Sequence, residues 1–181
     1  MTRRPRLGLT SLALPVALLV ASAAPGAADT SAKLRIGTFD SRLVALAYYR
    51  SAHGHDALSG LREDIARAKA ANDDKRLKGL EAKGPALQNL MHQQVFGCLS
   101  VPNVLAAVSD SLPMIAARAG VSMLVSKWEI RCDTSGAERV DVTLQIVDLF
   151  QPDPATRAMI EDAMKQKAAP VPVEQLLDPY E

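Results

Sequence analysis

The sequence predicts an α+β fold in which strands from both ends of the chain form a small mixed sheet, with a projecting helical hairpin. Residues 34–39 alternate apolar with polar or small side chains, and residues 121–130 and 139–142 carry further strand patterns. Residues 56–96 instead space their apolar side chains by three and four, as helices packed along one seam do. A hydrophobic content of 48% in 181 residues suits one domain with an appendage.

The first 28 residues have the features of a secretory signal peptide. Three arginines precede an apolar run over residues 7–21, and small residues follow up to Ala28. The run is shorter than the roughly 20 apolar residues that span a membrane. We therefore expect cleavage after Ala28 and an exported, periplasmic protein, with residues 29–181 as a single domain.

The charge balance argues against nucleic acid as a partner. The chain has 21 Lys and Arg against 20 Asp and Glu, and loss of the three leader arginines makes the mature chain slightly acidic. Phosphate binding needs a basic excess, and an aromatic content of 4% leaves few rings to stack on bases. We expect no nucleic-acid partner and no membrane span after signal cleavage.

A strand and a helix open the mature domain. The alternation over residues 34–39 has the period of a half-buried strand. Asp40 and Ser41 then offer an N-cap for a helix over residues 42–50. Residues 34–50 and 101–150 together form the expected body of the domain.

The middle of the chain predicts a helical hairpin over residues 56–96, which we call the arm. One apolar seam runs along residues 56–71 and another along 74–96. Gly84 and Pro85 predict a kink or a restart in the second helix, because proline removes a helical hydrogen bond. The seams could pair within one hairpin or between chains. The expected contacts within or between arms are Leu61, Ile65, Leu80 and Leu87.

The chain then returns to the body. Residues 100–119 predict a helix that Pro113 bends and Gly120 ends, since glycine tolerates the left-handed C-terminal conformation. The strand patterns at 121–130 and 139–142 flank a turn sequence. They predict a β-hairpin with a long loop.

A C-terminal helix and an extended tail occupy residues 151–181. Before them, Thr143 can cap a helix over residues 144–150. Asp153 and Pro154 are an N-cap and first-turn signal for a helix to about Lys167.

Cys98 and Cys132 are the two cysteines of the chain. In an oxidising compartment one intramolecular disulfide is the simplest pairing, and two separate buried thiols are the alternative. The spacing is not Cys-x-x-Cys, so a redox-active pair is not indicated.

No motif predicts catalysis. The chain lacks a Gly-x-Ser-x-Gly nucleophile motif and a glycine-rich phosphate loop. His53 and His55 do not share a helical face, and nothing in the sequence brings His92 near them, so a three-ligand metal site is not expected. We expect no enzyme activity, no metal and no cofactor. The alternative site is a polar pocket formed by Asp40, Tyr48, His92 and Trp128.

Residues 35–44, 116–125 and 140–149 resemble segments of the Skp or OmpH-like family of periplasmic chaperones. Residues 35–44, which begin Arg35-Ile36-Gly37-Thr38-Phe39-Asp40, are similar to the family's opening strand and helix start. Residues 116–125 resemble its late helix running into a strand, and residues 140–149 resemble its closing Asp-Ile-Thr segment and helix. The resemblance implies trimers whose helical arms enclose unfolded outer-membrane proteins.

Two functional hypotheses from different classes follow. The first is an exported holdase-type chaperone or envelope scaffold, a homo-oligomer with a trimer as the expected form, that binds unfolded or outer-membrane proteins through apolar arm faces. The second is a periplasmic small-ligand-binding or sensory module without catalysis, which uses the pocket at Asp40 and Trp128. A metal-dependent enzyme that uses the histidines is a third and weaker alternative.

Overall fold

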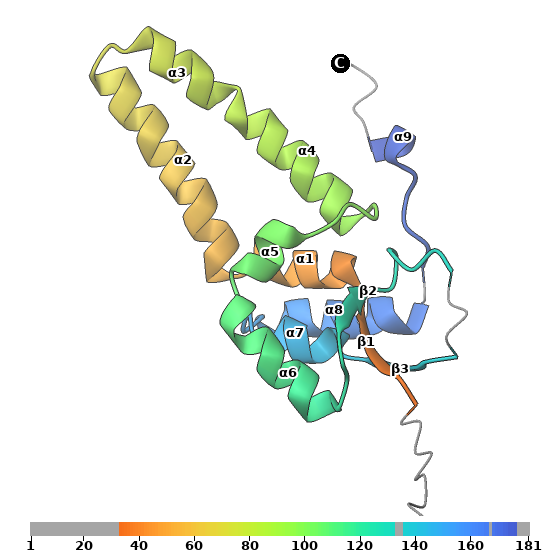
Figure 1. The fold of residues 1–181 in the computed structure, drawn as a ribbon. Helices are drawn as coiled ribbons and strands as arrows, with labels where there is room; N and C mark the ends of the chain where they lie inside the picture. Colours follow the sequence, from red (N-terminus) through yellow and green to blue (C-terminus); the bar gives the residue numbers. More distant parts are fainter. Residues whose placement is uncertain (1–32, 133–135, 167, 177–181) are drawn as a thin grey trace, which may run out of the picture. The chain divides into compact units, whose positions relative to one another are not determined.

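Three short strands from distant parts of the chain pair in parallel in the computed structural model, which describes residues 33–132, 136–166 and 168–176 (Figure 1). β1 (Arg35–Phe39) is central, with β2 (Leu124–Ser126) on one side and β3 (Glu138–Asp141) on the other. Helices make up most of the remaining described residues. The α+β class predicted from the sequence is confirmed.

The sheet is parallel rather than mixed, and this corrects two predictions. β1 pairs in parallel with both β2 and β3, so these two strands lie on opposite edges and do not form the predicted hairpin. Gly37 explains the close approach of β1 and β2, because a Cβ there would lie 2.6 Å from a methyl carbon of Leu124. The connection from β1 to β2, residues 40–123, is long enough for the crossover that this parallel pair needs.

Helix α1 (Ser41–Tyr49) lies at the centre of the hydrophobic core. It packs against α7 (Thr143–Asp148) and α8 (Pro154–Gln166), and Asp40 caps its N-terminus as predicted. Asp153 caps α8 by accepting hydrogen bonds from the backbone N–H groups of Ala155 and Thr156. The least exposed core side chains are Val44, Ala45, Ala47, Val104, Val142, Ile146, Val147 and Ile160.

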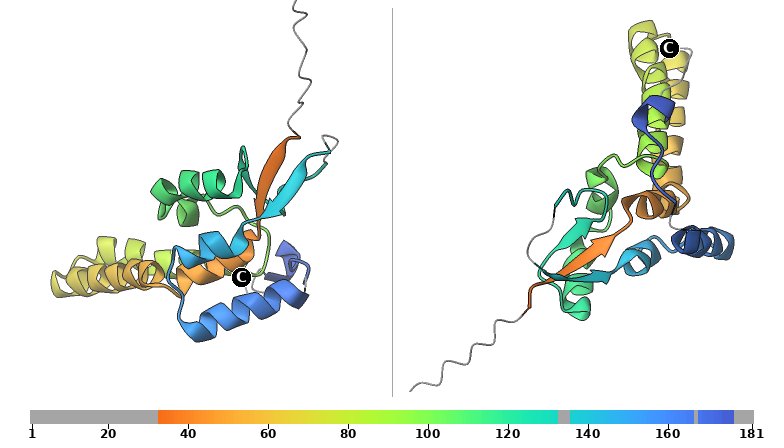
Figure 2. Two further views of the ribbon diagram at one scale, coloured as in Figure 1. Left: turned by 90° about the horizontal axis from the view of Figure 1, so that it is seen from below. Right: turned by 90° about the vertical axis from the view of Figure 1, so that its right-hand side faces the viewer.

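The arm is a hairpin of α2 (Ala52–Ala70), α3 (Asp74–Glu81) and α4 (Lys83–Val95). Figure 2 shows it extending away from the sheet in two further views. The second helix restarts at Ala82, so Pro85 falls in the first turn of α4, where a missing N–H costs no helical hydrogen bond. α2 and α3 pack together near the tip, while α2 and α4 both contact α1 at the base.

The two seams meet within one chain at the tip of the arm. Ala68 of α2 and Leu80 of α3 are buried there. Asp64 bonds Arg76 at 3.1 Å and Lys69 approaches Glu81 at 3.8 Å, which joins α2 to α3.

The helix predicted over residues 100–119 is interrupted. It consists of α5 (Pro102–Ala106), a 3-10 turn (Ser109–Ser111) and α6 (Leu112–Ala119), with Pro113 in the first turn of α6. Gly120 ends α6 with a φ of 61°, the left-handed cap that the sequence predicts.

The C-terminal tail is tied to the end of the arm and is not wholly extended. The backbone N–H of Val171 donates to the Phe96 carbonyl at 2.8 Å, and a short helix, α9 (Val173–Leu176), follows. α9 packs against α4. Within the described ranges, no helix is both long and apolar enough to cross a membrane.

Candidate functional site

A buried carboxylate lies where β1 ends and α1 begins. Asp40 is 2% exposed. One carboxylate oxygen accepts hydrogen bonds from Trp128 Nε1 at 2.8 Å and Arg42 Nε at 3.2 Å. The other accepts from Lys127 Nζ at 2.7 Å and Arg42 Nη2 at 3.1 Å. Both cations also lie over the Trp128 ring, so this cluster joins the ends of β1 and β2.

The same cluster reaches α7 and the C-terminal segment. The backbone N–H of Asp40 donates to Thr143 Oγ1 at 2.9 Å, which links α1 to the start of α7. Arg42 Nη2 donates to the Ala168 carbonyl at 2.8 Å. Because protein donors satisfy both oxygens of Asp40, the cluster is a structural anchor at the carboxyl edge of the sheet.

The pH dependence of stability should reveal this anchor. Burial alone raises the pKa of Asp40, but hydrogen bonds from Arg42, Lys127 and Trp128 outweigh it, so the pKa lies below its usual value. The contribution of the ionised carboxylate is therefore fully present above about pH 5 and is lost as the pH falls through the folded-state pKa. Urea unfolding from pH 6 down to about 3 should show the stability gap between wild type and Asp40→Asn narrowing on acidification.

Asp64 and Asp153 provide an internal reference for that measurement. Hydrogen bonds from Arg67 and from the Thr156 hydroxyl, respectively, also lower the pKa of these carboxyls. Both residues are present in wild type and in Asp40→Asn, so their titration cancels in the difference between the two proteins. A gap that stays constant down to pH 3 would contradict the assignment to Asp40.

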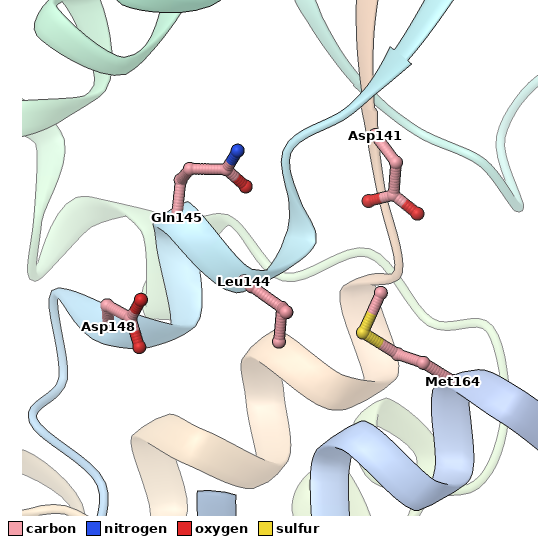
Figure 3. A pocket seen from close by; sticks show the side chains of 5 residues that line it. All are labelled: Asp141, Leu144, Gln145, Asp148 and Met164. Atoms are coloured by element: carbon pink, nitrogen blue, oxygen red, sulfur yellow. The ribbon is translucent and has the colours of Figure 1, made fainter.

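A surface pocket of about 430 Å³ lies beside the end of β3 (Figure 3). The carboxyl ends of parallel strands often bind ligands, but here Asp141 accepts a hydrogen bond from the Thr143 backbone N–H at 2.8 Å and Asp148 forms an ion pair with Arg157. Leu144 and Met164 point toward each other across the pocket. The two carboxylates thus already serve a turn and an ion pair.

A second pocket of about 420 Å³, the arm-base groove, lies between α1, α2, α4 and α5. None of the described residues that line it carries a charge, although the arm around it is rich in charged residues. Its lining is Tyr48, Tyr49, Gly54, Leu58, Gly84, Pro85, Leu87, Gln88, Met91 and Asn103.

A hydrogen-bond network holds Tyr49 and Asn103 of the groove lining in place. The Tyr49 hydroxyl donates to Gln94 Oε1 at 2.7 Å. Gln94 is 1% exposed, and its Nε2 donates to the Ser100 carbonyl at 2.9 Å and to Asn103 Oδ1 at 2.7 Å. Burial raises the pKa of Tyr49, and a hydrogen bond with Asn103 partly offsets this effect. An apolar wall beside a few fixed polar groups is the usual composition of a binding pocket.

The structure brings together only two of the four residues of the predicted polar pocket. Asp40 and Trp128 are hydrogen-bonded to each other. Tyr48 packs edge-on against Phe150 and lines the arm-base groove. His92 packs against Phe96 at the end of α4.

The predicted arm residues fall at different depths. Leu80 is buried at the tip, Leu61 and Ile65 are half-buried along α2, and Leu87 lines the arm-base groove.

Both cysteines are free, so the expected disulfide is absent from this structure. Cys98 follows the turn after α4 and Cys132 lies in the loop before β3, and both side chains are exposed. The predicted signal peptide lies outside the described residues. Within the described residues, no three His, Cys, Asp or Glu side chains are grouped to hold a metal ion.

The predicted polar pocket does not include Tyr49, Gln94 or Asn103, which the structure joins by hydrogen bonds. Gln94 had a usable signal, because it stands three residues after Met91 and continues the seam of α4 with a polar side chain. A polar residue in an apolar seam needs a buried partner. No comparable pattern marks Asn103.

Comparisons with protein families, with curated proteins and with solved structures find no match to this chain.

Proposed function

We propose that this protein is an exported, holdase-type polypeptide-binding protein or envelope scaffold. It holds unfolded or outer-membrane proteins non-covalently in the arm-base groove and uses no nucleotide. The signal-peptide pattern of residues 1–28 supports export. The resemblance of its strand-bearing segments to the Skp or OmpH-like family supports the same class of activity.

The opening of the apolar seam toward the arm base carries this proposal. Near the tip, Ala68 and Leu80 of the seam are buried against each other's helices. Toward the base, Leu58, Leu87 and Met91 continue the same seam but line an open groove, with Leu58 39% exposed. Apolar side chains in such a groove gain free energy when a partner covers them.

An aggregation assay tests the proposal. At molar excess, the mature protein should suppress aggregation of an unfolded outer-membrane β-barrel protein without nucleotide. Leu58→Lys should require about tenfold more protein for the same suppression, because it places a charge in the groove and removes an apolar contact.

Leu99→Lys is the matched control. Leu99 is also 39% exposed but does not line the groove, so this variant should act like wild type. Absence of suppression at excess would refute the proposed function. Equal losses of suppression in Leu58→Lys and Leu99→Lys would show that the client does not bind in the groove.

Assembly into a homo-oligomer, with a trimer as the expected form, is part of the proposal. Sedimentation of the mature protein measures it directly, and a strict monomer would refute the trimeric arrangement.

A small-ligand-binding module is the second candidate function. The network of Tyr49, Gln94 and Asn103 beside the apolar wall favours it, because such fixed polar groups orient small ligands. Its signature would be saturable binding of a small apolar compound by a protein that does not suppress aggregation.

A further inference from the structure

We propose that the arm-base groove selects an aromatic side chain with a hydrogen-bonding group, tyrosine or tryptophan, from the bound polypeptide. This inference rests on the proposed function of the arm. It specifies which part of a client the groove recognises.

The absence of charge in the lining excludes acidic and basic side chains. Lys83 directly precedes Gly84 of the groove and Asp56 lies close to Leu58 in sequence, yet neither lines it. A charged side chain that entered the groove would lose water without gaining a partner of opposite charge. The matching occupant is therefore a neutral side chain.

The shape and the chemistry of the wall favour a ring. Two tyrosine rings, 5.0 Å apart and edge to face, form the side toward α1. The Met91 thioether lies in the wall on α4, and sulfur makes favourable contacts with ring edges. The volume of about 420 Å³ accommodates one aromatic side chain with its flanking backbone.

The hydrogen-bonding group of the occupant has a partner in Gln88. Its side chain is exposed at the groove and makes no hydrogen bond within the described part of the chain. Asn103 is less available, because its Oδ1 already accepts from Gln94. An amide that donates and accepts can bond a phenol hydroxyl or an indole N–H. Gln88 is the residue that would distinguish tyrosine from phenylalanine.

Peptide titrations on the full mature chain test this selectivity. The probes are acetylated, amidated pentapeptides Gly-Ser-Xaa-Ser-Gly with Tyr, Phe or Asp at the centre, and affinity is measured from backbone amide resonances. We expect the Tyr peptide to bind about threefold to tenfold more tightly than the Phe peptide, the range for one neutral hydrogen bond. The Asp peptide should bind at least about tenfold more weakly than the Phe peptide.

Gln88→Ala should remove the preference for Tyr over Phe while leaving the affinity for the Phe peptide unchanged. Gln93→Ala is the matched control, because Gln93 is an amide on the same helix outside the groove lining. Equal affinities for the Tyr and Asp peptides, or a preference for Tyr that survives Gln88→Ala, would overturn the inference. So would binding of free 4-methylphenol as tight as that of the Tyr peptide, since the occupant would then be a small molecule.

The two proposals fail separately. Suppression of aggregation without peptide selectivity would leave the holdase function and remove the aromatic specificity. Selective peptide binding without suppression of aggregation would keep the aromatic specificity and remove the holdase function.

Discussion

Replacing Asp40 with alanine is expected to lower the free energy of unfolding by about 3–5 kcal/mol, the cost of breaking a buried ion pair from one side. The substitution leaves Arg42 and Lys127 beside each other without a counter-charge and removes the acceptor of the Trp128 indole N–H. It also removes the N-cap of α1. Urea denaturation at pH 7, followed by far-UV circular dichroism, measures the loss.

Asp73→Ala is the matched control for this experiment. Asp73 also caps a helix, since it accepts a hydrogen bond from the Arg76 backbone N–H at the start of α3, but its side chain is exposed. Its loss should cost about 1 kcal/mol, the value of a cap alone. If both variants lost the same free energy, the Arg42, Lys127 and Trp128 contacts would contribute nothing beyond capping.

The parts of the fold that could be predicted from the sequence are those that short-range patterns determine. Asp40 and Asp153 cap helices because a side-chain oxygen can satisfy N–H groups two or three residues later. Gly120 ends α6 because glycine alone adopts the left-handed conformation without strain. Each of these signals acts within one helical turn, so the sequence contains all the information needed.

Strand pairing was not predictable in the same way. Alternation of apolar and polar residues tells which face of a strand is buried but not which strand is its neighbour. β1 has a neighbour on both edges, and Gly37 permits the close approach of Leu124 on one of them. Trp128 is another such case, because its indole N–H reaches Asp40 only when β1 and β2 end together.

The arm-base groove depends on how far two helices diverge, which heptad spacing does not encode. Ala68 and Leu58 belong to one seam, and Leu80 and Leu87 belong to the other, each with the same spacing of three and four residues. Yet Ala68 and Leu80 are buried, whereas Leu58 and Leu87 line an open groove. The difference arises because α1 packs against both α2 and α4 at the base of the arm. Since α1 is itself anchored at Asp40, the sheet edge supports the helix on which Tyr48 and Tyr49 are placed.

Gln94→Leu is expected to lower the free energy of unfolding by about 2–3 kcal/mol, although leucine has nearly the same size as glutamine. The cost arises because the buried Gln94 side chain makes three hydrogen bonds that leucine cannot make: with the Tyr49 hydroxyl, the Ser100 carbonyl and Asn103 Oδ1. The affinity of the groove for the Tyr peptide should also fall, since Tyr49 and Asn103 line the groove. Chemical denaturation gives the first effect, and the Tyr-peptide titration gives the second.

A double-mutant cycle with Tyr49→Phe separates the network from simple packing. Tyr49→Phe removes the hydroxyl that donates a hydrogen bond to Gln94 Oε1. The double variant with Gln94→Leu should therefore lose less free energy of unfolding than the sum of the two single losses, by about 0.5–1 kcal/mol or more. Gln93→Leu, next to it on α4, should change stability by no more than about 0.5 kcal/mol, because no hydrogen bond of its side chain is lost within the described residues. Strict additivity in the cycle would mean that Tyr49 and Gln94 support the groove independently and that the hydrogen bond between them carries no coupling.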